Sequence, residues 1–331
     1  MQNSRPLLTI SIPTYNRVVF LNELLSCLFD QCVSNPKIEL LVSDNDSSDE
    51  TPSVVKAYID RGLAIRYLRN TANVGADRNF LQCFEKAQGK YVWIIGDDDV
   101  VTPGAIEKII LYLEANEYNL IYVNSYGFDD PMSSKRVMSY RAPKVIKDAR
   151  VFARVVHIFF TFISGNIINK DHVVAVNQKE LSSLVGTNLV QLGWTYAALN
   201  GYKRGLYIHE QLVGMRTNNT GGYMLSQVFG ANLKNITEDR LQDPTIARSI
   251  INRTLMRFLP AALLNLRRSP ARFEKERAPE TILTPLFGGN FRYWFFVFPI
   301  LRMPYVLASG WLVLIRIYNK LDKILGSILM R

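Results

Sequence analysis

Along the first 125 residues, short apolar runs alternate with segments whose apolar residues recur at helical spacing. The runs predict buried β-strands, and the periodic segments predict helices with one buried face. We expect strands at residues 7–12, 38–42, 65–68, 91–95 and 120–123, and helices from residue 20, from Thr51-Pro52, at 77–87 and after a cap at Thr102-Pro103. Regular strand-helix alternation predicts an α/β fold with a doubly wound, mostly parallel sheet.

The pattern is less regular beyond Gly127. It predicts helices at 151–160 and 189–199, strands at 162–168 and 206–215, and mainly helices after Tyr223. A one-sided apolar stripe runs from Ile251 to Leu266. We therefore expect one domain over residues 1–225 and a separate helical region over residues 226–331.

Polar loops follow the first four predicted strands. They are Pro13–Arg17, Ser43–Asp49, Asn70–Gly75 and Gly96–Asp99. The carboxyl ends of parallel strands meet at one edge of a sheet, where ligands of such sheets bind, so we expect one site there. None of the loops has the glycine spacing of a P-loop or of a dinucleotide-binding turn.

Three consecutive carboxylates, Asp97, Asp98 and Asp99, form the last of these loops. Carboxylates held close together repel and raise one another's pKa unless a cation is present. Mg²⁺ or Mn²⁺ would remove this repulsion, because both prefer oxygen ligands. The alternative is a solvated acidic turn in which Asp99 helps to cap the next helix; the three neighbouring polar loops favour the metal site.

Composition bounds the protein class. An apolar fraction of 48% in 331 residues predicts a globular protein with a real core. The three cysteines, Cys27, Cys32 and Cys83, have no metal-ligand spacing and are expected to be buried free thiols in a reducing, cytoplasmic compartment. The polar N-terminus does not resemble a signal peptide.

The net charge of +10 is concentrated in the C-terminal region, where residues 251–331 contain thirteen Lys or Arg and four Asp or Glu. The apolar segments 293–298 and 305–317 are interrupted by Pro299, Arg302 and Pro304, so we expect no clean membrane span. An apolar stripe over residues 317–328 has basic neighbours and predicts a helix that lies on an anionic membrane surface. Nucleic acid is the competing partner for this charge, but no nucleic-acid-binding module accompanies it. A helical subdomain packed on the core is the structural alternative, and the oligomeric state stays open.

Four motifs, in order, resemble the signature of family 2 glycosyltransferases. They are Ser11–Arg17, Val42–Thr51, Asn73–Asn79 and Ile95–Asp99, and within the family they are most similar to bacterial O-antigen sugar transferases of the abequosyltransferase kind. The resemblance covers about residues 7–125 strongly. It implies a GT-A fold with a nucleotide-sugar half (1–125) and an acceptor half (126–225).

The resemblance also implies an activity. A sugar would pass from a nucleoside-diphosphate donor (CDP-, UDP-, GDP- or dTDP-linked, including a dideoxy sugar such as CDP-abequose) to a hydroxyl of a polyprenyl-diphosphate-linked oligosaccharide. Mn²⁺ or Mg²⁺ would be the cofactor, and the protein would act at the cytoplasmic face of the bacterial inner membrane as a peripheral or monotopic protein. A nucleotidyltransferase and a non-catalytic, membrane-associated sugar-nucleotide-binding protein are the alternatives.

Residue roles follow from the same resemblance. The donor nucleotide would contact Pro13, Thr14, Tyr15, Arg17, Asp44, Asp46, Asn73, Arg78 and Asp97. Asp97, Asp98 and Asp99 would supply the metal ligands, with Asp97 and Asp99 touching the ion, and His209 is either a further ligand or a structural histidine. The sequence departs from the family at Gly96, where an aspartate is frequent.

The catalytic base is not evident. Family members usually carry an acidic residue on a helix of the acceptor half, but the predicted helix 189–199 has Gln191, Trp194 and Tyr196 instead. Possible substitutes are Asp171, Glu180, His157, His209 and Glu210, unless the enzyme retains configuration and needs no base there. Arg216, with Asn218 and Asn219, could close over the diphosphate as a lid or belong to an ordinary polar loop.

Overall fold

The structure is a computed structural model that describes residues 5–129, 141–177, 179–217, 222–268, 273, 274, 276 and 278–328. The chain divides into two compact units. The first consists of residues 1–152 and 159–217, and the second of residues 153–158 and 218–331.

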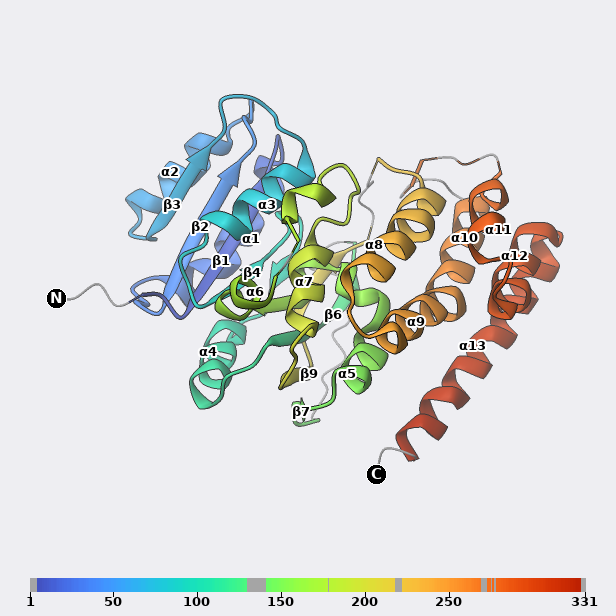
Figure 1. Ribbon diagram of the computed structural model, residues 1–331. Coiled ribbons are helices and arrows are strands. Elements are labelled where there is room, and N and C mark those ends of the chain that lie inside the picture. Colours follow the sequence, from blue (N-terminus) through green and yellow to red (C-terminus); the bar gives the residue numbers. More distant parts are fainter. Residues whose placement is uncertain are drawn as a thin grey trace. The chain divides into compact units, whose positions relative to one another are not determined.

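The first unit is built on a mixed sheet (Figure 1). In the described residues its strands are β1 (Leu8–Thr14), β2 (Ile38–Asp44), β3 (Ile65–Arg69), β4 (Tyr91–Ile94), β5 (Val100–Val101), β6 (Leu120–Phe128), β7 (Lys144–Ile146), β8 (Asn166–Asn169) and β9 (Gly205–Arg216). Their order is β3-β2-β1-β4-β8-β6-β9-β5, with β7 paired to β9. The strands from β3 to β4 are parallel, as are β6 and β9, which confirms the predicted α/β sheet.

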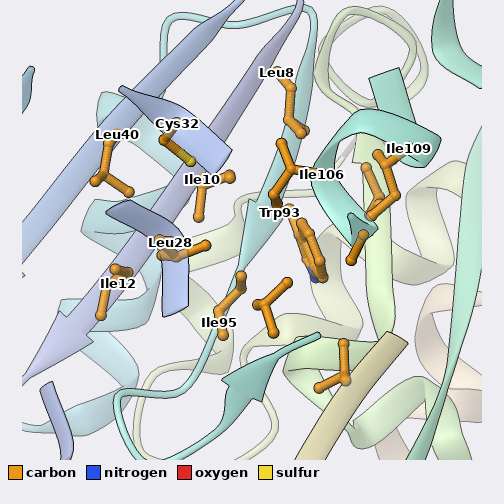
Figure 2. Close-up of a cluster of buried hydrophobic side chains, with 14 of the residues drawn as sticks. Leu8, Ile10, Ile12, Leu28, Cys32, Leu40, Trp93, Ile95, Ile106 and Ile109 are labelled. Atoms are coloured by element: carbon orange, nitrogen blue, oxygen red, sulfur yellow. The ribbon is translucent and has the colours of Figure 1, made fainter. Parts of the chain in front are cut away.

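Helices pack on both faces of the sheet. They are α1 (Val18–Cys32), α2 (Thr51–Asp60), α3 (Ala76–Lys86), α4 (Ala105–Ala115), α5 (Ala149–Val156), α6 (Lys170–Val176) and α7 (Gln191–Leu199). Alternate residues of β1 point to opposite faces. Leu8, Ile10 and Ile12 join α1 and α4 in one core (Figure 2), whereas Ser11 donates to the Cys83 carbonyl of α3. Because β1, β2, β3 and β4 run parallel, their carboxyl ends, and hence the loops that follow them, lie at one edge of the sheet.

Several predicted boundaries differ from the structure, and two of the differences lie next to the acidic run (Asp97–Asp99). The strand expected at 162–168 is shorter, because a 3₁₀ turn occupies Ile163–Gly165 and the Asn166 amide donates to the Phe162 carbonyl (2.7 Å). The prediction that Thr102 caps the fourth helix is wrong: α4 begins after Gly104, which has a φ of +74°. The reason is that the unforeseen strand β5 extends toward Thr102, whose N–H donates to the Leu212 carbonyl (3.0 Å).

The second unit is helical in its described residues. Its helices are α8 (Leu233–Arg240), α9 (Pro244–Arg253), α10 (Leu259–Arg268), α11 (Glu280–Phe287), α12 (Phe298–Arg302) and α13 (Tyr305–Ile328), with π-helical turns at Gln227–Asn232, Thr254–Phe258 and Tyr293–Val297. The apolar stripe predicted from Ile251 to Leu266 lies in its core with residues of α11 and α13. No helix of the described chain is long and apolar enough to cross a membrane.

Candidate active site

Strand register brings the four predicted loops together. Thr14 pairs with Asp44, and Asp44 pairs with Arg69, so β1, β2 and β3 end side by side. On the other side of β1, Ser11 pairs with Ile94, two residues before Gly96. The Thr14 hydroxyl donates to Asp97 Oδ2 at 2.8 Å, so the first and fourth loops touch directly.

The first and second loops are joined by Asn16. Its backbone is left-handed, with a φ of 51°, and its Oδ1 accepts from the Ser48 N–H at 2.7 Å. The Asn16 N–H donates to the Ser47 hydroxyl at 2.9 Å. Asparagine tolerates this conformation better than most residues. In this conformation, Asn16 links the loop after β1 to the loop after β2.

Asp44 lies fully buried beneath these loops. Its Oδ1 accepts from the Ser47 N–H at 2.9 Å, and the Tyr67 hydroxyl donates to its Oδ2. Burial and this carboxylate raise the pKa of Tyr67 above its usual value. Asp46 is more exposed and lies 3.3 Å from the Arg69 guanidinium. In this state Asp44 shapes the loop, while Asp46 is at its surface.

The third loop is held by Asn45, which is buried. Its amide donates to Asn73 Oδ1 at 2.8 Å, and its Oδ1 accepts from the Val74 N–H at 2.9 Å. Gly75 follows with a φ of +86°, a conformation that favours glycine. Arg78, in the first turn of α3 after this loop, and Tyr15, on the first loop, are exposed and can contact a ligand.

Asp97 and Asp99 are almost completely buried. Burial raises the pKa of Asp97 to about 6, against the opposing effect of the Arg17 guanidinium. Burial also raises the pKa of Asp99, and the neighbouring charge of Asp98 raises it further. Arg17 Nη1 lies 3.1 Å from Asp97 and 3.6 Å from Asp98. A side-chain cation thus already sits among these carboxylates.

Asp98 and Asp99 approach each other over Gly96. A Cβ added at Gly96 would lie 3.1 Å from Asp98 Oδ1 and 3.5 Å from Asp99 Oδ2, so those oxygens share one small space. Carboxylate oxygens are hard ligands of the kind that Mg²⁺ and Mn²⁺ prefer. In the described part of the chain, no three His, Cys, Asp or Glu side chains converge closely enough to form a complete metal site. The carboxylate oxygens are thus the right kind of ligand for the predicted metal ion. The remaining ligands of the ion would have to come from outside these side chains.

Ser164 supports the acidic run and was not foreseen from the sequence. Its hydroxyl accepts from the Gly96 N–H at 2.9 Å and bonds Asp99, while its carbonyl accepts from the Trp93 indole at 2.8 Å. Ser164 lies 68 residues beyond Gly96, within a segment that read as a plain strand. No local pattern marks such a contact.

Arg216, at the end of β9, is packed against the acidic run. Its backbone N–H donates to Asp99 Oδ1 at 3.2 Å, and its Nε donates to the Asp98 carbonyl at 3.2 Å. The guanidinium pairs with Glu23 and lies 4.7 Å from the ring centroids of both Phe20 and Phe128. The two asparagines of the predicted lid, Asn218 and Asn219, lie outside the described residues.

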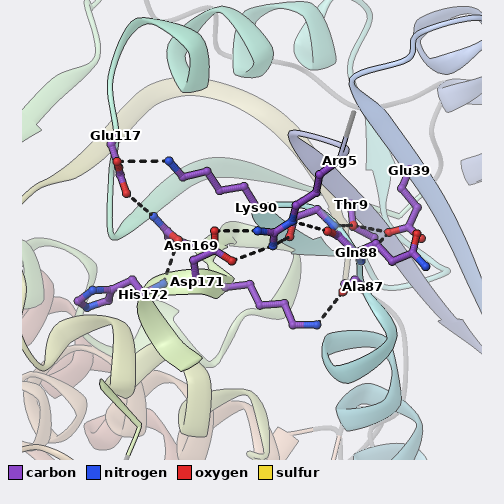
Figure 3. Close-up of polar contacts among 12 residues, drawn as sticks. Arg5, Thr9, Glu39, Ala87, Gln88, Lys90, Glu117, Asn169, Asp171 and His172 are labelled. Carbon is purple, nitrogen blue, oxygen red and sulfur yellow. Dashed lines mark hydrogen bonds and ion pairs between the residues drawn. The ribbon is translucent and has the colours of Figure 1, made fainter. Parts of the chain in front are cut away.

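The structure does not bring the candidate bases to the acidic run. Asp171 lies at the opposite edge of the sheet, where it forms an ion pair with Arg5 at an N–O distance of 2.8 Å (Figure 3). Glu210 forms an ion pair with Lys108 at 2.7 Å. His209 lies seven positions before Arg216 on β9, or roughly 15 Å along the strand once its bulges opposite β6 are allowed for. Glu180 lies beside Ser182 just before a 3₁₀ turn, and His157 is buried in the part of α5 and its following turn that belongs to the second unit.

Gln191 begins α7, the helix on which an acidic residue was expected. Its amide nitrogen donates to the Thr161 carbonyl at 2.7 Å, and Thr161 precedes Ser164 by three residues. The side chain is 6% exposed, and its Oε1 has no hydrogen-bond partner in the described structure. An acceptor without a donor in this position can receive one from a ligand or from water.

Comparison with known proteins places this site in a family. Residues 9–173 match the family described as "Glycosyl transferase family 2". The chain is 38% identical over 110 residues to abequosyltransferase RfbV of Salmonella typhimurium, covering 33% of each chain. It is 32% identical over 113 residues to the GalNAc(5)-diNAcBac-PP-undecaprenol beta-1,3-glucosyltransferase of Campylobacter jejuni, covering 34% of this chain and 35% of the relative. The matches thus span about a third of these relatives' length.

Among solved structures, the S. aureus TarS fragment 1–349 in complex with UDP-GlcNAc is similar to this chain. The TM-score is 0.63 at 13% sequence identity, over 85% of this chain and 80% of the other. At that identity the likeness concerns the fold, which is the GT-A fold expected from the motifs. Through residues 9–173, the chain is a member of glycosyl transferase family 2.

Proposed function

We propose that the protein transfers a sugar from a nucleoside-diphosphate donor to a hydroxyl of a lipid-linked oligosaccharide in surface-polysaccharide synthesis. The observation that carries the proposal is the meeting of four strand-end loops at one edge of the sheet, where Asp97 accepts from both Thr14 and Arg17 of the first loop. Residues 1–125 would bind the donor, and residues 126–225 would bind the acceptor. The family membership and the names of the relatives support this reading.

Donor binding would use the exposed rim of these loops. Tyr15 and Arg78 are exposed there, and Asp46 and Asn73 lie on the second and third loops. Pro13, Thr14 and Asp44 lie buried behind them and fix the loop backbones. Arg17 is one-third exposed and could exchange a carboxylate for a donor phosphate, since guanidinium binds both groups in the same geometry.

Mn²⁺ or Mg²⁺ would bind at the acidic run and stabilise the negative charge that develops on the departing nucleoside diphosphate. Asp98 and Asp99, whose oxygens approach each other over Gly96, are the best placed to hold it. Asp97, already bonded to Thr14 and Arg17, would orient the pair. His209 is too far along β9 to join them without a rearrangement.

Arg216 would become a phosphate ligand only by leaving Glu23. Its guanidinium is 10% exposed and is held by that carboxylate and by two aromatic rings. The backbone N–H of Arg216 donates to Asp99, so a metal ion bound by Asp99 would directly affect this hydrogen bond and hence the position of Arg216. This connection supports the predicted lid.

Membrane association would follow from the surface of α13. Val306, Leu307, Val313, Leu314, Ile317, Tyr318 and Leu321 are exposed, while Ala308, Leu312 and Ile315 are buried in the core of the second unit. At 3.6 residues per turn, the exposed residues cover an arc of roughly 140°. We name this arc the outer face. Arg316 and Lys320 lie along one edge of it, as in helices that lie on an anionic bilayer. The cytoplasmic face of the bacterial inner membrane, with its lipid-linked substrates, would be the location.

A non-catalytic sugar-nucleotide-binding protein is the second candidate, because Gln191 takes the place of the expected acid. The nucleotidyltransferase alternative lacks the glycine-rich basic loop it would need after β1. The test measures release of nucleoside diphosphate from CDP-, UDP-, GDP- and dTDP-sugars with Mn²⁺, with and without lipid-linked acceptor. Acceptor-dependent release supports transfer, whereas donor binding without release supports the non-catalytic candidate. If no donor binds, both fail.

A further inference from the structure

The second unit contains a cluster of arginines, which we name the arginine cluster: Arg154, Arg253 and Arg257. Arg253 ends α9, and Arg257 follows one turn later. Both reach Asp322 of α13, with Nη2–Oδ2 distances of 3.4 Å and 2.9 Å. Arg154, from the part of α5 that belongs to this unit, lies close enough to act on Arg253 electrostatically.

The cluster has more positive than negative charge. In the described residues, Asp322 is the carboxylate in ion-pair contact with Arg253 and Arg257, so these two guanidinium groups share one negative charge, and the positive charge of Arg154 adds to theirs. Arg253 and Arg257 are only 11% and 21% exposed, so water compensates them incompletely. Burial, and then the charge of Arg257, lowers the pKa of Arg253 to about 10. The buried Nε–H of Arg257 also lacks an acceptor among the described residues.

The position of Asp322 on α13 places this cluster beside the outer face. At 100° per residue, Asp322 lies about 40° around the helix from Tyr318, which borders the outer face. Arg316 and Lys320 border the other edge. Cationic groups thus flank both edges of an exposed apolar surface. When such a surface contacts acyl chains, its edges lie at the depth of the lipid phosphates.

We propose that the arginine cluster binds the phosphate group of a membrane lipid. Guanidinium groups bind phosphate oxygens through paired N–H donors, and a phosphate would supply the missing negative charge. The excess of positive charge suits a diphosphate better than a singly charged phospholipid headgroup. The diphosphate assignment rests on the proposed function, since it identifies the lipid as the linked acceptor.

The experiment uses the full chain in EDTA, which keeps the donor site free of metal. Calorimetry measures binding of geranyl diphosphate, a soluble prenyl diphosphate, and flotation measures binding to phosphatidylglycerol vesicles. The test variant is Arg253→Gln/Arg257→Gln, and the control is Arg248→Gln, an exposed arginine on the same helix. Circular dichroism and thermal unfolding, measured separately, report whether each variant is folded.

We expect the double variant to bind geranyl diphosphate at least about tenfold more weakly, and the control to bind it normally. Asp322→Asn removes the competing carboxylate and is expected to strengthen binding, an effect that misfolding would not produce. If only vesicle binding weakens in the double variant, the site binds phospholipid headgroups and the diphosphate assignment is wrong. Unchanged binding of both probes would overturn the proposal. Sugar transfer is not part of this measurement, so a failure of the proposed function would leave its outcome intact.

Discussion

The acidic run of the first unit and the arginine cluster of the second unit are both groups of neighbouring like charges, but of opposite sign. Among the described residues, Asp97 and Asp98 form ion pairs with Arg17, while Arg253 and Arg257 form ion pairs with Asp322. In each cluster, several charges of the same sign are partly removed from water. Buried like charges of this kind are stable when a ligand of opposite sign completes them. The two proposed sites, one for a metal cation and one for a lipid phosphate, would thus be built by the same means.

The largest effect is expected from removing the anionic side of this comparison. Asp98→Asn/Asp99→Asn should lower sugar transfer by about a thousandfold or more, because the metal would lose its carboxylates and the leaving diphosphate its charge stabilisation. The measurement is nucleoside diphosphate release with Mn²⁺. Asp60→Asn, which changes an exposed aspartate paired with Lys56, is the matched control and should stay active. Full activity in the double variant would rule out this metal site.

The four polar loops of the first unit were predictable because each follows the carboxyl end of a strand, and parallel strands place these ends side by side. The contacts that complete the site were not. Glu23 meets Arg216 across 193 residues, and Ser164 meets Gly96 across 68, distances at which periodicity carries no information. The outer face of α13 was only partly predictable, since apolar residues occupy both its inner and outer sides up to residue 318. The amphipathic pattern in the sequence therefore predicted only the apolar stripe over residues 317–328.

A second effect concerns the surface that would bring the arginine cluster to a membrane. Leu314→Gln/Ile317→Gln places polar groups on the outer face and should weaken binding to anionic vesicles by about tenfold to a hundredfold, as expected for two apolar contacts. Flotation measures the bound fraction. The control is Leu111→Gln, which changes an equally exposed leucine of α4 in the first unit. Equal loss in both variants would show that general stickiness, rather than the outer face, drives binding.

The unfolding free energy, measured in EDTA at two pH values, tests whether the buried charge of Asp99 destabilises the first unit. The pKa of Asp99 in the folded protein is raised by burial and by Asp98, so its protonated form favours folding at low pH and this contribution is lost as pH rises through the folded pKa. Asp99→Asn has no charge to bury. We expect it to raise the unfolding free energy at pH 8 by about 1–2 kcal/mol and to have little effect near pH 4. Thermal unfolding at both pH values measures this, and a variant less stable than the parent at pH 8 would contradict the prediction.

The smallest effect is expected from the corresponding change in the arginine cluster, and its sign is opposite. Asp322→Asn removes the anion that two partly buried arginines share, so it should lower the unfolding free energy by about 1 kcal/mol in low salt. Added pyrophosphate should restore part of this loss, since it would bind the folded state preferentially. Chemical unfolding with and without pyrophosphate measures both quantities, with Asp60→Asn again as control. Neutralising an acid would then stabilise one unit and destabilise the other. If Asp322→Asn instead stabilised the protein, the arginines would already be satisfied by solvent, and the symmetry between the two clusters would fail.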